Sequence, residues 1–369
     1  MLPTTGARSP LFALAVSAGF VLIFIFGFLA WQSPPRIPFP HGSTHVEMSI
    51  TDNKAPISIA EIVRLLYSPL RIAPNEPQFS FLDDGTNLSS LSLPENPRYT
   101  KKLGRDVLIL DLETRPLKST EDFEQGVYDW RKLNHVSGGV FNHYTYALIH
   151  GYDYKFIHAH EFKDRHATWI KPSALANHIK DYKFIVFLDA DATFRFMHLP
   201  IEWMLNYWKI EPKHSITMAL DPWDPNEPQY NSDRFNRTYT NTGFMVVQNN
   251  PNTMELLRDW HECPDDTRYK GCSEWKQPKF HEQSAFGEYV RYDYEDYIKE
   301  LPCAEANGYP GVQISNCQGK FIRHYWFEKH LIKKDFRENM MNAITLPIQR
   351  IFAENAGGVI VEQPENVIY

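Results

Sequence analysis

From Asp106 to Phe194, short apolar runs alternate with segments whose apolar residues recur at helical spacing. The runs 106–113, 154–160 and 184–188 are typical of strands, and the segments 140–152 and 169–182 are typical of helices. Such alternation favours a mainly parallel sheet flanked by helices. We therefore predict an α/β fold, with further strands at 215–221 and 243–249 and further helices at 250–262 and 281–292.

The run 184–188, FIVFL, ends in two carboxylates, Asp189 and Asp191. Open α/β sheets bind ligands at the carboxyl ends of their strands. Residues i and i+2 of an extended segment point to the same face, so both carboxylates can contact one hard divalent cation. Asp-x-Asp is a short motif that also arises by chance, and a solvated pair in a turn is the alternative.

Several functional classes lack their sequence signatures. There is no GxxxxGK[ST] or GxGxxG phosphate-binding loop, and no GxSxG or HExxH hydrolase motif. The net charge of −7, without basic blocks, argues against a nucleic-acid partner. A cation with few protein ligands, in a site able to take a diphosphate, fits a glycosyltransferase that uses a nucleotide-sugar donor.

The N-terminus predicts a membrane anchor. Residues 11–31 carry no charge, and 21 residues of helix span about 30 Å, the thickness of a bilayer core. A cleaved signal peptide is the alternative, although its apolar region is usually shorter. We expect a cytoplasmic tail at 1–10, a transmembrane anchor at 11–31, a Pro-rich stem at 32–103, a catalytic domain at 104–345 and a tail at 346–369.

Two features predict that the body lies in an oxidising lumen. All four cysteines fall in two close pairs, which favours the disulfides Cys263–Cys272 and Cys303–Cys317; four reduced cysteines in a cytosolic protein are the alternative. Asn87 in NLS and Asn236 in NRT are candidate glycosylation sites. The expected location is therefore the lumenal side of a membrane, with the chain in type II orientation.

Seven segments, taken in order, resemble a known family. They are FNHYTYALIHGYDY, TWIKPSAL, FIVFLDADATF, NTGFMVVQNNP, LLRDWHECP, HEQSAF and FIRHYWFEK, between residues 104 and 335. They are similar to the α-galactosyl/mannosyl/xylosyltransferases of fungi and plants, glycosyltransferase family 34. The resemblance implies a Golgi enzyme with a GT-A fold that retains anomeric configuration. It also implies a nucleotide-sugar donor and an oligosaccharide or glycoprotein acceptor, and leaves open a homo- or hetero-oligomer.

The same resemblance implies a Mn²⁺ site formed by Asp189, Asp191 and His324. An imidazole beside two carboxylates is more consistent with a transition metal than with Mg²⁺ or Ca²⁺; an ordinary histidine at a strand end is the alternative. Gln283 would lie near the anomeric carbon. Glu282 stands where the family more often has Asp, so the sequence does not determine which sugar hydroxyl this side chain would contact. We take Gln283, Glu282 and Asp191 as the catalytic candidates.

Further residues are assigned by resemblance to the donor or the acceptor. Asn241 and Gly243 would line the acceptor side, where Gly243 would let the backbone approach the sugar; a turn at a strand start explains that glycine equally well. For several of the donor-side residues named next, an ordinary solvent-exposed position explains the side chain nearly as well. The donor-side candidates are Asp189, Asn142, Lys171, Lys329, Leu110 and Asp111.

Two other functions remain possible from the sequence. A catalytically silent relative could bind glycans or organise partner transferases. Glu282, where the family more often has Asp, is compatible with this alternative. A membrane-anchored metal phosphohydrolase would need a second metal site of Asp and His residues, for which the sequence offers no clustered candidate.

Overall fold

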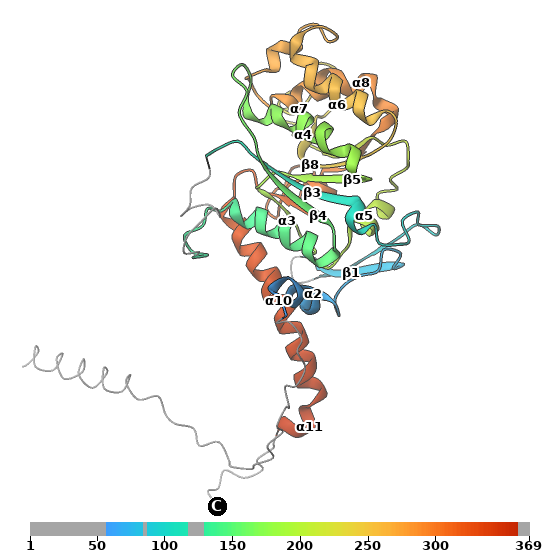
Figure 1. Ribbon diagram of the computed structural model, residues 1–369, viewed down its shortest axis with the longest axis vertical. Helices are drawn as coiled ribbons and strands as arrows, with labels where there is room; N and C mark the ends of the chain where they lie inside the picture. The colour runs from blue at the N-terminus through green and yellow to red at the C-terminus, as the bar shows by residue number, and fades with distance from the viewer. Residues whose placement is uncertain (1–56, 84–86, 117–128, 361–369) are drawn as a thin grey trace, which may run out of the picture. The chain divides into compact units, whose positions relative to one another are not determined.

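The computed structural model describes residues 57–83, 87–116 and 129–360 (Figure 1). At its centre lies a six-stranded sheet in the order β4-β3-β5-β8-β7-β9. β3 is parallel to β4 and β5, β7 is parallel to β9, and β8 is antiparallel to β5 and β7. The predicted mixed α/β sheet is confirmed. Its strands are β3 (Val107–Glu113), β4 (Asp153–His158), β5 (Phe184–Leu188), β7 (Ile216–Leu220), β8 (Thr240–Gln248) and β9 (Ile298–Leu301).

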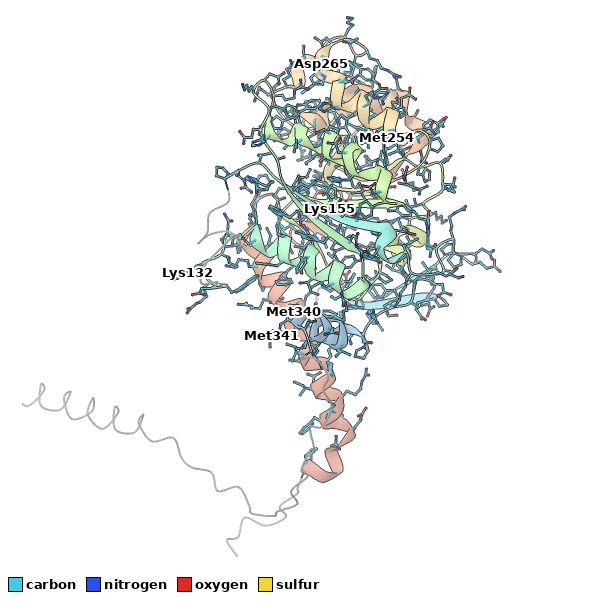
Figure 2. All side chains as sticks on the ribbon, viewed as in Figure 1. Lys132, Lys155, Met254, Asp265, Met340 and Met341 are labelled. Carbon is cyan, nitrogen blue, oxygen red and sulfur yellow. A yellow bond between two sulfur atoms is a disulfide. The ribbon has the colours of Figure 1, made fainter. Side chains whose placement is uncertain are left out.

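Helices cover both faces of the sheet (Figure 1). α3 (Ser137–His150) and α10 (His330–Glu354) lie on one face, and α4 (Ile170–His178) and α6 (Thr253–Glu262) on the other. The alternation of a strand divides its side chains between these layers. Val107 and Ile109 of β3 therefore join the first core, whereas Leu108 and Leu110 join the second. In Figure 2 the label of Met340 marks the layer of the first core, and the label of Met254 marks the layer of the second core.

Short elements complete the chain. β6 and β10 form a separate two-stranded ladder, and β1 and β2 form a hairpin. The helix predicted at 281–292 is divided into α7, a π-helical turn at Phe286–Val290 and α8, which ends one residue later at Asp293. The bounds are α2 (Ile59–Tyr67), β1 (Gln78–Asp83), β2 (Asn87–Ser92), β6 (Ala192–Phe194), α5 (Ile201–Tyr207), α7 (Glu282–Ala285), α8 (Arg291–Asp293), α9 (Cys303–Ala306), β10 (Ile322–His324) and α11 (Ala356–Val359).

Part of the segment predicted as a stem, 32–103, packs on the body of the protein, and residues 32–56 lie outside the described residues. From Ile57 onward the chain packs on the body, because Tyr67, Phe79 and Phe81 are buried in the first core. The backbone N–H of Tyr99 also donates to Oδ1 of Asn206, at 2.8 Å. At the other end, α10 runs through the boundary predicted at residue 345 and ends at Glu354.

The cysteines pair as their spacing predicts. Disulfides join Cys263 to Cys272 and Cys303 to Cys317. Both candidate glycosylation asparagines, Asn87 and Asn236, are exposed.

The expected anchor at 11–31 and the tail before it lie outside the described residues. Within the described ranges from residue 57 to residue 360, no helix combines the length and apolar character that a membrane span needs.

Gly139 in α3 should be intolerant of a side chain. A Cβ there would lie 2.1 Å from the carbonyl oxygen of Ala190, in the turn between the two carboxylates. Overpacking of this kind costs about 1–3 kcal/mol, which exceeds the gain of about 1 kcal/mol that alanine offers a helix. Urea denaturation should therefore show that Gly139→Ala lowers the free energy of unfolding.

The matched control is Gly357→Ala in α11, where a Cβ would meet no described atom within 4 Å. It should leave stability unchanged or slightly higher. Equal destabilisation by the two substitutions would contradict the close packing of α3 on the turn.

Candidate metal and sugar-transfer site

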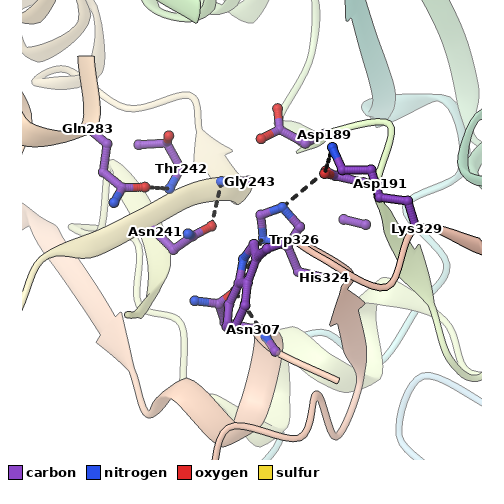
Figure 3. Close-up of polar contacts among 12 residues, drawn as sticks. Asp189, Asp191, Asn241, Thr242, Gly243, Gln283, Asn307, His324, Trp326 and Lys329 are labelled. Carbon is purple, nitrogen blue, oxygen red and sulfur yellow. Dashed lines mark hydrogen bonds and ion pairs between the residues drawn. The ribbon is translucent and has the colours of Figure 1, made fainter. Parts of the chain in front are cut away.

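The two carboxylates and the imidazole predicted as metal ligands converge at one edge of the sheet (Figure 3). Asp189 and Asp191 occupy the turn between β5 and β6. β10 pairs antiparallel with β6 and sets His324 opposite Ala192. The imidazole Nε2 consequently lies 3.1 Å from Oδ1 of Asp191. One candidate ligand atom from each of the three residues lies within 4.8 Å of the other two.

Gly243 on β8 makes room for the imidazole. A Cβ at this position would lie 2.1 Å from Cε1 of His324. Its carbonyl oxygen also accepts a hydrogen bond from the backbone N–H of Asp189, at 2.8 Å. The structure thus explains this glycine by the close approach of a ligand side chain, whereas the sequence predicted the approach of a sugar.

The two aspartates have different electrostatic surroundings. Burial favours protonation of Asp191, but the facing His324 and Lys329 outweigh it and hold the pKa of that carboxyl below its usual range. Burial raises the pKa of Asp189, and Lys171 opposes the rise only in part. A divalent cation between the two carboxylates would supply the missing positive charge. Two carboxylates and one imidazole are a donor set that can hold a divalent metal ion.

Lys171 connects this cluster to a second buried carboxylate. Its Nζ lies 3.0 Å from Asp189 and 3.2 Å from Glu282. Burial disfavours the charged amine, yet the two facing carboxylates raise the pKa of Lys171 above its ordinary value. Oε1 of Glu282 also accepts a hydrogen bond from Thr242 Oγ1, at 2.9 Å. The buried ammonium therefore stays charged and fixes both carboxylates.

Gln283 belongs to a second network, centred on Asp221. Its Oε1 accepts from the backbone N–H of Thr242 at 3.0 Å, and its Nε2 donates to Oδ2 of Asp221 at 2.6 Å. Oδ1 of Asp221 accepts from the amides of Asn241, at 2.8 Å, and Asn307, at 3.3 Å. Burial raises the pKa of Asp221. This carboxylate was missed from sequence, although it directly follows β7 as Asp189 follows β5.

Two clefts open beside the cluster. The first has a volume of about 490 Å³, and Asp189, Asp191, Lys171 and Lys329 contribute to its wall. The second, of about 520 Å³, presents polar groups together with several aromatic rings. The polar residues in its wall include Asp221, Asn241 and Gln283, and the aromatic residues include Tyr230, Phe280, Tyr309, Trp326 and Phe327.

Leu110 and Asp111 do not reach the first cleft. Leu110 is fully buried in the second core. Asp111 is buried, 2.7 Å from Nδ1 of His143, and accepts from the hydroxyl of Tyr154 at 2.6 Å. Leu112 is the first residue of β3 that lines the cleft, because the strand continues beyond Leu110 and Asp111 to Glu113.

Asn142, another donor-side candidate, does not line the first cleft either. This side chain is buried and bonds both backbone groups of Phe194: its Oδ1 accepts from the N–H at 2.8 Å, and its Nδ2 donates to the carbonyl oxygen at 3.1 Å. Asn142 therefore ties α3 to β6 and holds the ladder that carries the cluster.

Gly243→Ala should weaken metal binding without unfolding the protein. The added methyl group collides with the imidazole and pushes it away from Asp191. Loss of one ligand in three should lower Mn²⁺ affinity at least tenfold, as measured by calorimetry. Unchanged affinity would show that His324 is not held by this packing.

The two lysines beside the carboxylates should differ in their effect on stability. Lys171→Met leaves Glu282 buried and Asp189 partly buried without this countercharge, which should cost about 3–5 kcal/mol. Lys329 is 48% exposed, so Lys329→Met should cost less than about 1 kcal/mol. Thermal and urea unfolding measure both variants, and equal losses would contradict this difference in burial.

Comparison with known proteins identifies the family. No curated protein sequence matches the chain significantly. Among solved structures it is similar to a glycosyltransferase involved in glycosylation of the major capsid of PBCV-1 (13% identity, 63% of this chain and 98% of that one, TM-score 0.43). It is also similar to the galactosyltransferase LgtC (12% identity, 51% of this chain and 76% of that one, TM-score 0.31). A third similar structure is the glycosyltransferase GlyE of Streptococcus pneumoniae TIGR4 (11% identity, 56% of this chain and 51% of that one, TM-score 0.34). A family model, nucleotide-diphospho-sugar transferase, matches residues 126–341. Because that match spans more than half of the chain, the protein belongs to this family and is a glycosyltransferase.

Proposed function

We propose that the protein transfers a hexose or pentose from a nucleoside-diphosphate sugar to a hydroxyl of a glycan or glycoprotein, with Mn²⁺ held by Asp189, Asp191 and His324. The observation that carries the proposal is the convergence of these three side chains beside the first cleft. A cation in this position supplies positive charge that stabilises the departing nucleoside diphosphate.

The two lysines would have different roles on the donor side. Lys329 is half exposed, and its Nζ lies 2.8 Å from Oδ2 of Asp191. This side chain can turn toward a diphosphate in the first cleft, because it is itself half in solvent and Asp191 keeps its contact with His324. Lys171 is buried between two carboxylates, so it orients Asp189 and Glu282 while staying in place.

The second cleft suits the acceptor. Its aromatic rings offer flat apolar surfaces, and Asn241 and Gln283 offer amides that can bond to sugar hydroxyls. The carboxylates beside Gln283 are both engaged, Glu282 with Lys171 and Asp221 with asparagine amides. This supports a front-face reaction with retention of configuration, in which Gln283 lies near the anomeric carbon and neither carboxylate is the nucleophile.

We further propose that the enzyme belongs with glycosyltransferase family 34 and works as a single-pass type II protein of the Golgi membrane. The seven sequence segments support the family. The uncharged run 11–31, the two disulfides and the exposed Asn87 and Asn236 support a lumenal catalytic domain.

Asp191→Asn should abolish metal-dependent activity. The substitution removes a charged ligand and should reduce both transfer and donor hydrolysis by at least a hundredfold. A panel of UDP-galactose, GDP-mannose and UDP-xylose with Mn²⁺ measures the loss and identifies the donor. The control is Asp296→Asn, an exposed carboxylate that precedes β9 and so lies toward the opposite edge of the sheet.

Unchanged turnover of Asp191→Asn would overturn the metal assignment. If the wild-type protein turns over no donor, calorimetry with nucleoside diphosphate distinguishes an untested donor from a silent scaffold. A transferase should bind the nucleotide with heat that depends on Mn²⁺, and a scaffold should not.

A further inference from the structure

One ring nitrogen of His324 has two neighbours of opposite hydrogen-bonding character (Figure 3). The indole Nε1 of Trp326 donates to Nδ1 at 3.0 Å. Oδ1 of Asn307 lies 3.2 Å from the same Nδ1. An indole N–H can only donate, and an amide oxygen can only accept. The two neighbours therefore require different tautomers of the same ring.

The orientation of the Asn307 amide is fixed by its other contacts. Its Nδ2 donates to the carbonyl oxygen of Leu220 at 3.1 Å and to Oδ1 of Asp221 at 3.3 Å. Its Oδ1 accepts from the backbone N–H of Gly308 at 3.0 Å. Rotating the amide would set its oxygen against two acceptors. Asn307 thus presents an acceptor to the imidazole, and its contact with Nδ1 is a hydrogen bond only when Nδ1 carries the proton.

Occupation of the metal site selects between the two tautomers. Without a cation, Nε2–H can donate to Asp191 at 3.1 Å, and Nδ1 accepts from Trp326. A cation bound at Nε2 needs that lone pair, so the proton must lie on Nδ1, where it is donated to Asn307. Both tautomers are neutral, so the exchange moves one proton within the ring and changes no net charge.

Trp326 extends this exchange to the second cleft. It is half-buried and forms part of that cleft's wall with Gln283 and Asn241. When Nδ1 carries the proton, the indole N–H loses its acceptor. It then becomes a free donor on a residue that lines the cleft in which, by the proposed function, a sugar hydroxyl binds.

We propose that Asn307 and Trp326 are opposed positioning residues: Asn307 stabilises the metal-binding tautomer of His324, and Trp326 stabilises the metal-free one. Cation binding then releases the indole N–H to the acceptor hydroxyl. Because coupling between two binding sites is reciprocal, acceptor binding strengthens cation binding in turn. The assignment of the acceptor rests on the proposed function, whereas the opposition at Nδ1 rests on the contacts alone.

Mn²⁺ affinity of the purified full-length protein, measured by calorimetry and by the EPR signal of free Mn²⁺, tests the proposal. Asn307→Leu removes the acceptor and should weaken Mn²⁺ binding about 10- to 100-fold. Trp326→Phe removes a bond made only in the metal-free state and should tighten binding about three- to tenfold. The matched control, Trp223→Phe, changes another half-exposed tryptophan and should leave affinity unchanged.

Opposite signs for the two variants support the proposal, and weakening by both overturns it. Should Asn307→Leu fail to fold, the sign for Trp326→Phe decides alone. If the wild-type protein binds no Mn²⁺ even with nucleoside diphosphate present, the proposed metal function fails instead. Acceptor coupling is measured by adding a sugar acceptor to the wild type and to Trp326→Phe. Only the wild type should gain Mn²⁺ affinity, and an equal gain in both would exclude coupling through the indole.

Discussion

The antiparallel pairing of β6 with β10 is the contact on which the site depends. His324 and Asp191 are 133 residues apart in the sequence, and this three-residue ladder brings them together. Backbone bonds extend it at both ends, from Tyr325 to Asp191 at 2.8 Å and from Arg195 to Phe321 at 2.9 Å. The backbone positions of Asp191 and His324 are therefore set by main-chain hydrogen bonding.

Around this ladder the protein fixes its charges before any substrate arrives. Lys171 is held between Asp189 and Glu282, and Asp221 receives three amides from three separate segments. Oriented charges in a buried site need no rearrangement when charge develops in a reaction, which is the basis of electrostatic preorganisation. Desolvation makes this arrangement costly for folding, and the pairing of each buried group offsets that cost.

Local patterns predicted much of the fold. The apolar runs located five of the six strands of the central sheet, but not β9. The helix predicted at 140–152 corresponds to α3, which is capped by Gly151 in the left-handed region, at φ 78°. The carboxylates after β5 were identified because open α/β sheets bind ligands at the carboxyl ends of their strands. Leu110 and Asp111, chosen for the donor side, do not line the first cleft, because the end of β3 is not marked in the sequence. A difference of two residues along this strand separates the cleft wall from the core.

Non-local contacts explain what the sequence could not show. The pairing of β6 with β10 and the burial of Phe79 and Phe81 are set by segments distant in the chain, so prolines nearby suggested a stem where the structure has a packed hairpin. His324 was found only through a family resemblance. Asn307 carries no motif, and its role becomes visible only from the four hydrogen-bonding contacts of its side chain.

The Cys303–Cys317 bridge has a consequence for how the enzyme is made. It closes a loop of sequence separation 14 that contains Asn307 and Gly308, and the Gly308 carbonyl oxygen accepts from the backbone N–H of His324 at 2.7 Å. Protein expressed in a reducing bacterial cytosol would lack this covalent closure beside the imidazole. Weak cofactor retention in such a preparation would then reflect the thiol chemistry of the host, and oxidative refolding or secretion would restore it.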